Sequence, residues 1–127
     1  MEPLYISATD ETPEVKLDAS KNLFEFSGKS LPEDVVTFYN PILDWLNNYS
    51  ENLNDTTQLV FTLDYFNTAS SKMILDILLK LEEFQEQGKG VKVLWKYAED
   101  DEDMQEAGED YQSIIEIPFS LIAVEEL

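Results

Sequence analysis

Alternating apolar and polar residues predict three short strands at the start of the chain, over residues 4–8, 14–17 and 22–27. In the third segment, Phe24 and Phe26 fall on one face of the predicted strand. The triplet Ser27-Gly28-Lys29 that follows is typical of a turn. The chain therefore starts with β-structure, and the first helix is predicted only after this turn.

A helical repeat of large apolar residues predicts the first helix. Its members recur every three or four positions: Val35, Phe38, Tyr39, Ile42, Trp45, Leu46 and Tyr49. Ser30 and Glu33 have the spacing of a capping box, and Pro32 suits a first helical turn. Pro41 lies within the repeat, where its missing backbone N–H group predicts a kink or a break.

The strongest strand signal covers residues 57–66. Every second residue from Leu59 to Tyr65 is apolar or aromatic, and Val60 and Phe66 add apolar side chains to the other face. A strand with two apolar faces is typical of a sheet interior that is covered on both sides. We therefore predict a central strand with cover on both faces.

A second helix and further strands are predicted downstream. The helix ends near residue 87, before two glycines, and carries the stripe Ile74, Ile77, Leu78, Leu81 and Phe84. Residues 91–97 alternate as a strand, and residues 104–111 allow a short solvated helix. Residues 113–117 are predicted as the final strand, and the apolar tail over 119–124 is expected to pack back. This order predicts a single α/β domain over residues 1–127, with helices packed against a mixed sheet.

Composition fits a folded domain with a strongly acidic surface. The apolar share is 43% and the aromatic share 12%, whereas a disordered chain is poorer in both. The net charge is −19, from 27 acidic residues and 8 basic residues that are all lysine. Such a surface chiefly favours solubility, and it repels nucleic acid and anionic membranes. Without arginine, bidentate readout of phosphate is also excluded.

Side chains that commonly carry catalysis or bind metals are scarce. The chain has no His and no Cys, so the commonest general base, the commonest metal ligand and any thiol nucleophile are missing. We expect a non-catalytic protein without a metal or cofactor that works by binding other proteins. The start of the chain has no signal-peptide pattern, and no apolar run is long enough to span a bilayer, which predicts a cytoplasmic protein.

Eight acidic residues lie between positions 99 and 110, with no basic residue among them. An EF-hand calcium loop needs the pattern D-x-[DN]-x-[DN]-G, which this run does not match. The favoured interpretation is a solvated charged segment. A small calcium-binding protein or a carboxylate-dependent enzyme is the remote alternative.

The segment between the central strand and the second helix is the main candidate site. Its residues are Asn67, Thr68, Ala69, Ser70, Ser71 and Lys72. Hydroxyl and amide side chains are expected at this position as helix N-caps. The functional interpretation is a regulatory hydroxyl, because the free amides and the dipole of a helix N-terminus stabilise a phosphate.

The stretch over residues 65–72, followed by Leu75-Asp76, resembles the signature of the SiaC family of bacterial regulatory phosphoproteins. Further segments fit the family pattern: Thr12-Pro13, Ser27-Gly28, Pro32-Glu33, Asp44-Trp45-Leu46, Trp95-Lys96-Tyr97, Glu106, Glu109-Asp110-Tyr111 and Ile117-Pro118-Phe119. The resemblance covers nearly the whole chain, which makes it more specific than any one motif. Ala69 stands where the family pattern has Ser.

The resemblance implies a fold similar to STAS domains, the class that includes anti-sigma-factor antagonists. It implies that a partner kinase phosphorylates Thr68 and that a metal-dependent phosphatase removes the phosphate. Ser70 and Ser71 are lesser candidates for the phosphorylated residue. In the family's best-known system, the unphosphorylated protein binds and activates a diguanylate cyclase and so promotes aggregation or biofilm formation.

Two functions are therefore weighed. The first is a switch of this kind, in which the neutral surface of residues 67–72 binds the effector. Phosphorylation is then expected to weaken binding, because the partner would have to bury an unpaired charge. The alternative is an anti-sigma-factor antagonist proper, which would share the switch but bind an anti-sigma kinase.

Overall fold

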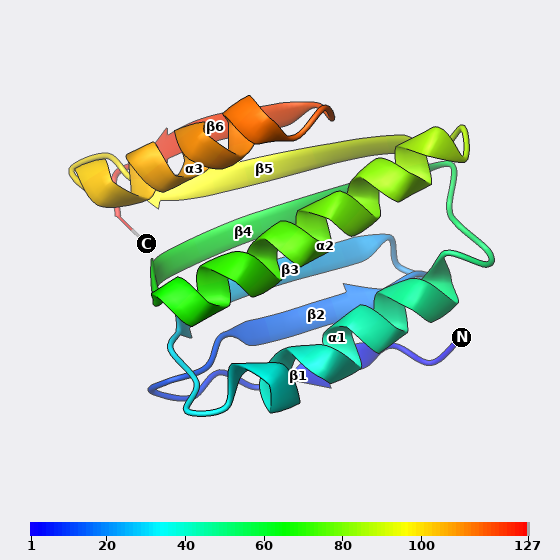
Figure 1. The fold of residues 1–127 in the computed structure, drawn as a ribbon, viewed down its shortest axis with the longest axis horizontal. Coiled ribbons are helices and arrows are strands. Elements are labelled where there is room, and N and C mark those ends of the chain that lie inside the picture. Colours follow the sequence, from blue (N-terminus) through cyan, green and yellow to red (C-terminus); the bar gives the residue numbers. More distant parts are fainter. Residues whose placement is uncertain (127) are drawn as a thin grey trace.

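Six strands form one mixed sheet, and three helices lie against it (Figure 1). The computed structural model describes residues 1–126. The strands follow one another across the sheet in chain order: β1 (Leu4–Ile6), β2 (Glu14–Asp18), β3 (Leu23–Ser30), β4 (Thr56–Phe66), β5 (Gly90–Ala98) and β6 (Phe119–Val124). The pairs β1–β2 and β2–β3 are antiparallel, whereas β3 to β6 are parallel. The predicted α/β class with a mixed sheet is confirmed.

All three helices cover the same face of the sheet (Figure 1). They connect successive parallel strands: α1 (Val35–Tyr49), α2 (Thr68–Glu86) and α3 (Glu102–Ile114). The strand order never reverses, and connections between neighbouring parallel strands are right-handed. Every connecting helix therefore lies on the same face of the sheet. In β4, Leu59, Phe61 and Leu63 are buried against the helices, whereas Gln58 and Asp64 of the other face are exposed. The central position predicted for β4 is confirmed, but its predicted cover on both faces is wrong.

β3 runs through residues 27–29, where the sequence predicts a turn. Gly28 has a φ of 107°, and the register against β4 shifts directly after it, so the triplet forms a bulge within the strand. Ser30 is therefore the last residue of β3 and not a helix cap. The N-cap of α1 is Asp34, whose carboxylate accepts a hydrogen bond of 3.1 Å from the N–H of Thr37. This bond holds the pKa of Asp34 below its usual value.

Pro41 does not split α1, which continues from Val35 to Tyr49. The proline lies on the exposed side of the helix. Thr37, whose carbonyl group would pair with an N–H at position 41, is exposed as well. Water can therefore take the place of the missing hydrogen bond.

The last strand is β6, not residues 113–117 as the sequence predicts. α3 extends to Ile114, and the connection after it buries Ile115 and Ile117. β6 then pairs with β5, and Phe119 lies opposite Val93. The apolar tail therefore forms the edge of the sheet, because only there do its backbone groups find a strand to pair with.

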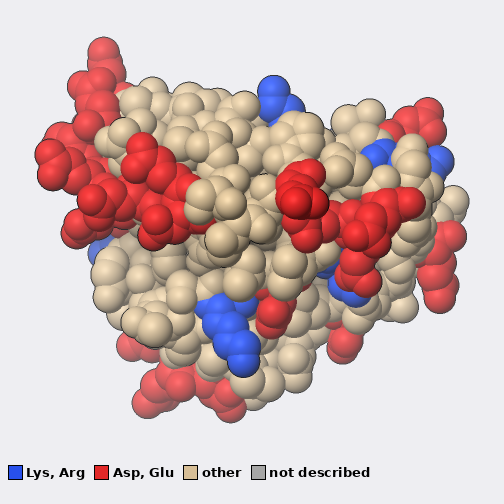
Figure 2. Space-filling view, turned by 45° about the horizontal axis from the view of Figure 1, so that its top comes forward, with Lys and Arg blue, Asp and Glu red and all other residues tan. Residues whose placement is uncertain are grey.

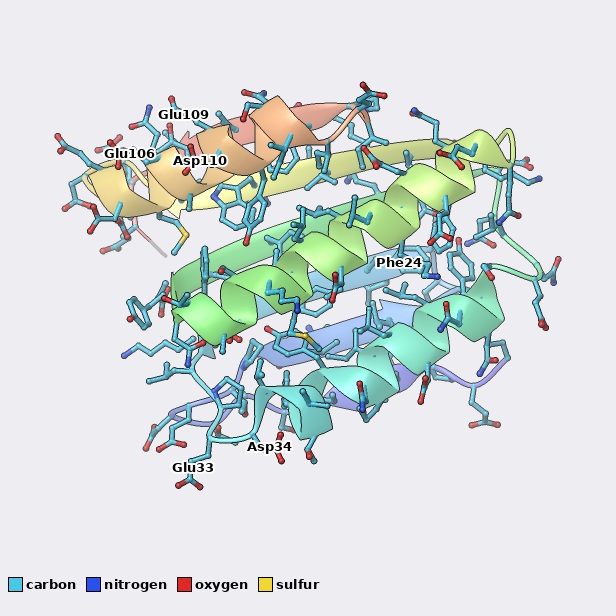
Figure 3. The ribbon with its side chains drawn as sticks, viewed as in Figure 1. Phe24, Glu33, Asp34, Glu106, Glu109 and Asp110 are labelled. Atoms are coloured by element: carbon cyan, nitrogen blue, oxygen red, sulfur yellow. The ribbon has the colours of Figure 1, made fainter. Side chains whose placement is uncertain are left out.

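Aromatic rings fill much of the space between the sheet and the helices. Phe24 lies between the sheet and the last turns of α1 (Figure 3), with its ring centroid 5.3 Å from that of Tyr49. Under α3, the buried ring of Trp95 lies 5.4 Å from the ring of Tyr111. Gly108 allows this close approach, since a Cβ added there would lie 2.5 Å from Trp95 Cδ1.

We predict that Gly108→Ala destabilises the protein, because the ring of Trp95 is 1% exposed and cannot move aside. The overpacking should lower the free energy of unfolding by about 1–3 kcal/mol, even though alanine favours a helix. Chemical denaturation measures this change. The matched control is Glu109→Ala on the exposed side of α3, which should leave stability unchanged or slightly raised. Equal stability of the two variants would contradict the close packing of α3.

Candidate functional site

The predicted site lies where β4 ends and α2 begins, at the edge of the sheet from which all three helices start (Figure 1). In open α/β sheets, this carboxyl edge of the parallel strands is the usual position of a functional site. Asn67 joins the two elements, and Thr68 is the first residue of α2. The topology therefore places the candidate segment at the end of the sheet where functional sites are usually found.

Asn67 fixes the start of α2 in two ways. Its side-chain Oδ1 accepts a hydrogen bond of 2.9 Å from the N–H of Ser70, which makes Asn67 the N-cap. Its own N–H donates to the carbonyl oxygen of Ser30 at 3.0 Å. Thr68 and Ala69, which follow, are both exposed. The backbone at Thr68 is thus held in place while its side chain reaches solvent.

Ser70 is completely buried, at 0% exposure. Its hydroxyl donates to the carbonyl oxygen of Ser30 and accepts from the Ser30 hydroxyl, both at 2.9 Å. The hydroxyls of Ser30 and Tyr39 lie 2.5 Å apart, and since Ser30 has already donated its proton, Tyr39 is the donor. Burial raises the pKa of Tyr39 and keeps it protonated.

This burial changes the role that the sequence assigns to Ser70. A kinase cannot reach its hydroxyl without opening the start of α2, and its side chain cannot contact a partner. Ser70 instead links the start of α2 to the last residue of β3, Ser30, and through the Ser30 hydroxyl to Tyr39 of α1. The prediction of Ser70 as a lesser phosphorylation candidate and as a partner contact is therefore not favoured by the structure.

Ser71 and Lys72 occupy the rest of the first turns of α2. Ser71 is half-buried, and its hydroxyl donates to the carbonyl oxygen of Thr68 at 2.6 Å. The hydroxyl of Tyr111 on α3 donates to the carbonyl oxygen of Ser71 at 2.7 Å. Lys72 is exposed and forms no ion pair with residues 1–126, whereas Lys80 pairs with Glu83 at 3.0 Å. Within the segment, Thr68 is thus the exposed hydroxyl and Lys72 the free cation.

A groove of about 340 Å³ opens beside this segment, between α2 and α3. It is lined by Phe66, Ser71, Lys72, Leu75, Ala107, Asp110, Tyr111 and Ile114. Apart from Ser71 and Lys72, these residues were not predicted as part of the site. The sequence did offer one signal, because Leu75 is an apolar residue of α2 that lies outside its predicted buried stripe. The sequence also places Ile114 in a strand, so its position on the exposed side of α3 could not be foreseen.

Acidic side chains surround the site without forming a metal site. They crowd over the end of the molecule at which α3 begins (Figure 2). Asp110 lies on the side of α3 nearer to α2 and Glu109 on the far side, while Glu33 and Asp34 lie at the start of α1 (Figure 3). Within residues 1–126, no three acidic side chains are arranged so that they could hold a metal ion. In the same part of the chain, no helix is long and apolar enough to cross a membrane.

We predict that Ser70→Ala lowers stability more than Ser71→Ala does. The first change leaves the buried hydroxyl of Ser30 without its acceptor, which should cost about 1–3 kcal/mol of unfolding free energy. The second removes a hydroxyl from the half-buried face of the same helix and should cost less than about 0.5 kcal/mol. Denaturant melts of the two variants measure the difference. If they melt alike, the Ser30–Ser70 contact does not hold the start of α2.

Known proteins share the sequence pattern and the fold of this chain. A protein of Pseudomonas aeruginosa (strain UCBPP-PA14) is 29% identical over 126 residues, which span 99% of this chain and 100% of that protein. Apo-SiaC from Pseudomonas aeruginosa has the same fold, with a TM-score of 0.88 and 29% identity over 97% of this chain and 100% of that chain.

SiaC is also known in complex with the diguanylate cyclase SiaD, of which it is the activator. That SiaC chain superposes with a TM-score of 0.90 and 29% identity, covering 95% of this chain and 99% of that chain. The sequence itself matches the SiaC family over residues 6–124. The chain therefore belongs to the SiaC family of regulatory phosphoproteins.

Proposed function

We propose that this protein is a phosphorylation-controlled switch whose unphosphorylated form binds and activates a diguanylate cyclase. The likeness to SiaC in its complex with SiaD carries this proposal, and it favours a cyclase over an anti-sigma kinase as the effector. A partner kinase adds the phosphate and a metal-dependent phosphatase removes it. The protein itself acts by binding and not by catalysis.

Thr68 is the residue that the kinase modifies. Its side chain is exposed at the first position of α2, whereas the hydroxyl of Ser70 is buried and that of Ser71 is bonded to the helix backbone. The amides of the first turn have no partners within the helix, and the dipole is positive there, so a phosphate is tolerated in the free protein. Lys72 follows one turn later on the same side of α2 and offers a counter-charge.

The phosphate controls binding without refolding the protein. Asn67 and Ser70 already hold the start of α2 in place, so the modification changes charge at a fixed point on the surface. It adds about −1.5 to −2 charges. An effector that covers Thr68 would have to remove water from this charge, which costs several kcal/mol when the charge is left unpaired. Phosphorylation therefore weakens the complex by local electrostatics.

Phosphate should be found on Thr68 after incubation with the cognate kinase. Peptide mapping by mass spectrometry locates it. Thr68→Ala should abolish labelling, and Ser71→Ala, three residues further along α2, should retain it. The protein incubated with labelled ATP alone should stay unlabelled. Phosphate confined to Ser70 or Ser71 would contradict the assignment, and labelling of the protein alone would show that it is a kinase.

The cyclase from the same organism should bind unmodified protein and Thr68→Ala equally well. Asn67 is the N-cap, so the alanine variant loses no cap and should fold normally. Phosphorylated protein and Thr68→Asp should bind at least about tenfold more weakly, a difference of about 1.4 kcal/mol. Calorimetric titration and cyclase activity measure this. The matched control is Thr56→Ala, an exposed threonine at the opposite end of β4. Equal or tighter binding of the phosphorylated form would make the phosphate part of the recognised surface instead.

A further inference from the structure

One face of the sheet carries no helix from the described residues 1–126, because all three helices lie on the other face (Figure 1). Strands β3 to β6 are parallel, and parallel strands usually have both faces covered. The uncovered side is called the open face. It consists of the side chains that alternate with the buried ones, and those at its centre are Glu25, Val60, Lys92, Leu94, Lys96 and Ile122.

Apolar side chains lie at the centre of the open face. Val60 on β4 and Leu94 on β5 are half-buried neighbours in the strand register, and Ile122 on β6 is half-buried as well. A hollow of about 270 Å³ lies beside them between β3 and β4, with Leu23 and Val60 among its walls. The face therefore offers both an apolar strip and a hollow that an apolar side chain of a partner can fill.

Charges on the open face differ from those on the rest of this acidic chain. Glu14 and Lys16 of β2 point to this face and pair with each other, with Lys16 Nζ 3.6 Å from Glu14 Oε1. Glu25 on β3 and the two lysines of β5, Lys92 and Lys96, form no ion pair within the described part of the chain. One strand thus presents an unpaired carboxylate, and a strand two positions away presents two unpaired ammonium groups.

A second copy of the chain supplies the matching pattern. When two sheets pack face to face, a two-fold axis parallel to β4 places β3 of one copy over β5 of the other. A rotation about this axis keeps each residue at its own level along the strands. Glu25, Val60 and Leu94 share one level, since they are register partners. Glu25 of one copy therefore faces Leu94 of the other, and Lys92 and Lys96 flank that position.

We propose that the open face is the interface of a homodimer. Val60 meets its counterpart at the two-fold axis, and Leu94 of each copy packs over the hollow between β3 and β4 of the other. Glu25 of each copy pairs with the two lysines of the other copy, so the same ion pairs form twice. A partner of one charge sign fits less well, because it would meet repulsion from either the lysines or Glu25.

The acidic surface does not oppose this arrangement. The acidic residues of α3 lie on the other face of the sheet (Figure 2), and packed layers lie about 10 Å apart. That separation exceeds the Debye length of about 8 Å at physiological ionic strength, so salt screens their repulsion. Six strands about 4.8 Å apart and about six residues long give a face of about 500 Å². A standard interface buries about 800 Å² per partner, so the dimer should be weak.

The dimer is compatible with the proposed function but does not rest on it. Thr68 lies at the carboxyl edge of the strands and belongs to the helix side of the sheet, so it stays exposed in the dimer. Because the two-fold axis follows the strands, both copies present Thr68 at the same end. The experiments below use the protein alone, without kinase or cyclase. Their failure would leave the switch untouched, and failure of the switch would leave the dimer untouched.

Sedimentation equilibrium at about 0.15 M salt should show a mass that rises with protein concentration from that of one chain toward that of two. Glu25→Lys should raise the dissociation constant at least about tenfold, because like charges then face each other. Glu109→Lys on the far side of α3 is the matched control, since it makes the same change in net charge and should retain the dimer (Figure 3). A single-chain mass at every concentration, or equal association of the two variants, would overturn the proposal.

A second charge reversal tests the pairing itself. The double variant Lys92→Glu/Lys96→Glu should also lose the dimer, because its glutamates face Glu25. When it is mixed with Glu25→Lys, however, every facing pair again has opposite signs, and the mixture should form a dimer of one copy of each. All three positions lie on the surface, so circular dichroism should show both variants folded. A mixture that stays as single chains, or a double variant that dimerises by itself, would overturn the proposal.

Discussion

The carbonyl oxygen of Ser30 is the point on which the junction between β4 and α2 depends. It accepts one hydrogen bond from the backbone of Asn67 and another from the hydroxyl of Ser70. Through the Ser30 hydroxyl, the same cluster reaches Tyr39 on α1. Three elements are therefore joined where the chain turns from β4 into α2. Because these buried polar groups are costly to leave unpaired, they hold this junction in one arrangement.

The rigid junction determines which hydroxyl faces outward. With Asn67 as the cap and Ser70 turned into the core, Thr68 is directed to solvent at the first position of the helix. A phosphate can be added there without disturbing the bonds beneath it. The phosphorylation proposed for Thr68 would then change the surface charge on a fixed framework, without refolding the protein.

The one-sided sheet places this hydroxyl beside a groove. Since all three helices lie on one face, α2 lies between the other two and shares a groove with α3 (Figure 1). That groove starts beside Ser71 and Lys72 and ends on the acidic side of α3. Asp110 on the α3 side of the groove belongs to a chain with a net charge of −19, whereas Lys72 on the α2 side is basic. The phosphate proposed for Thr68 would therefore outweigh the charge of the basic side chain that lines the groove.

The sequence alone determined the helices and strands that have a strong apolar periodicity. Each of them buries a long apolar stripe, and it does so regardless of which other element packs against it. The helix stripes and the interior strand over residues 57–66 follow from such local patterns, and the proposed role of the segment at Thr68 follows from the family motif. Tertiary contacts decided the rest. Residues 27–29 continue a strand because β4 offers a ladder beside them, and residues 119–124 form a strand because β5 does. The burial of Ser70 depends on Ser30, forty residues away, and the groove needs two helices side by side. Such pairings join distant parts of the chain, so no local pattern encodes them.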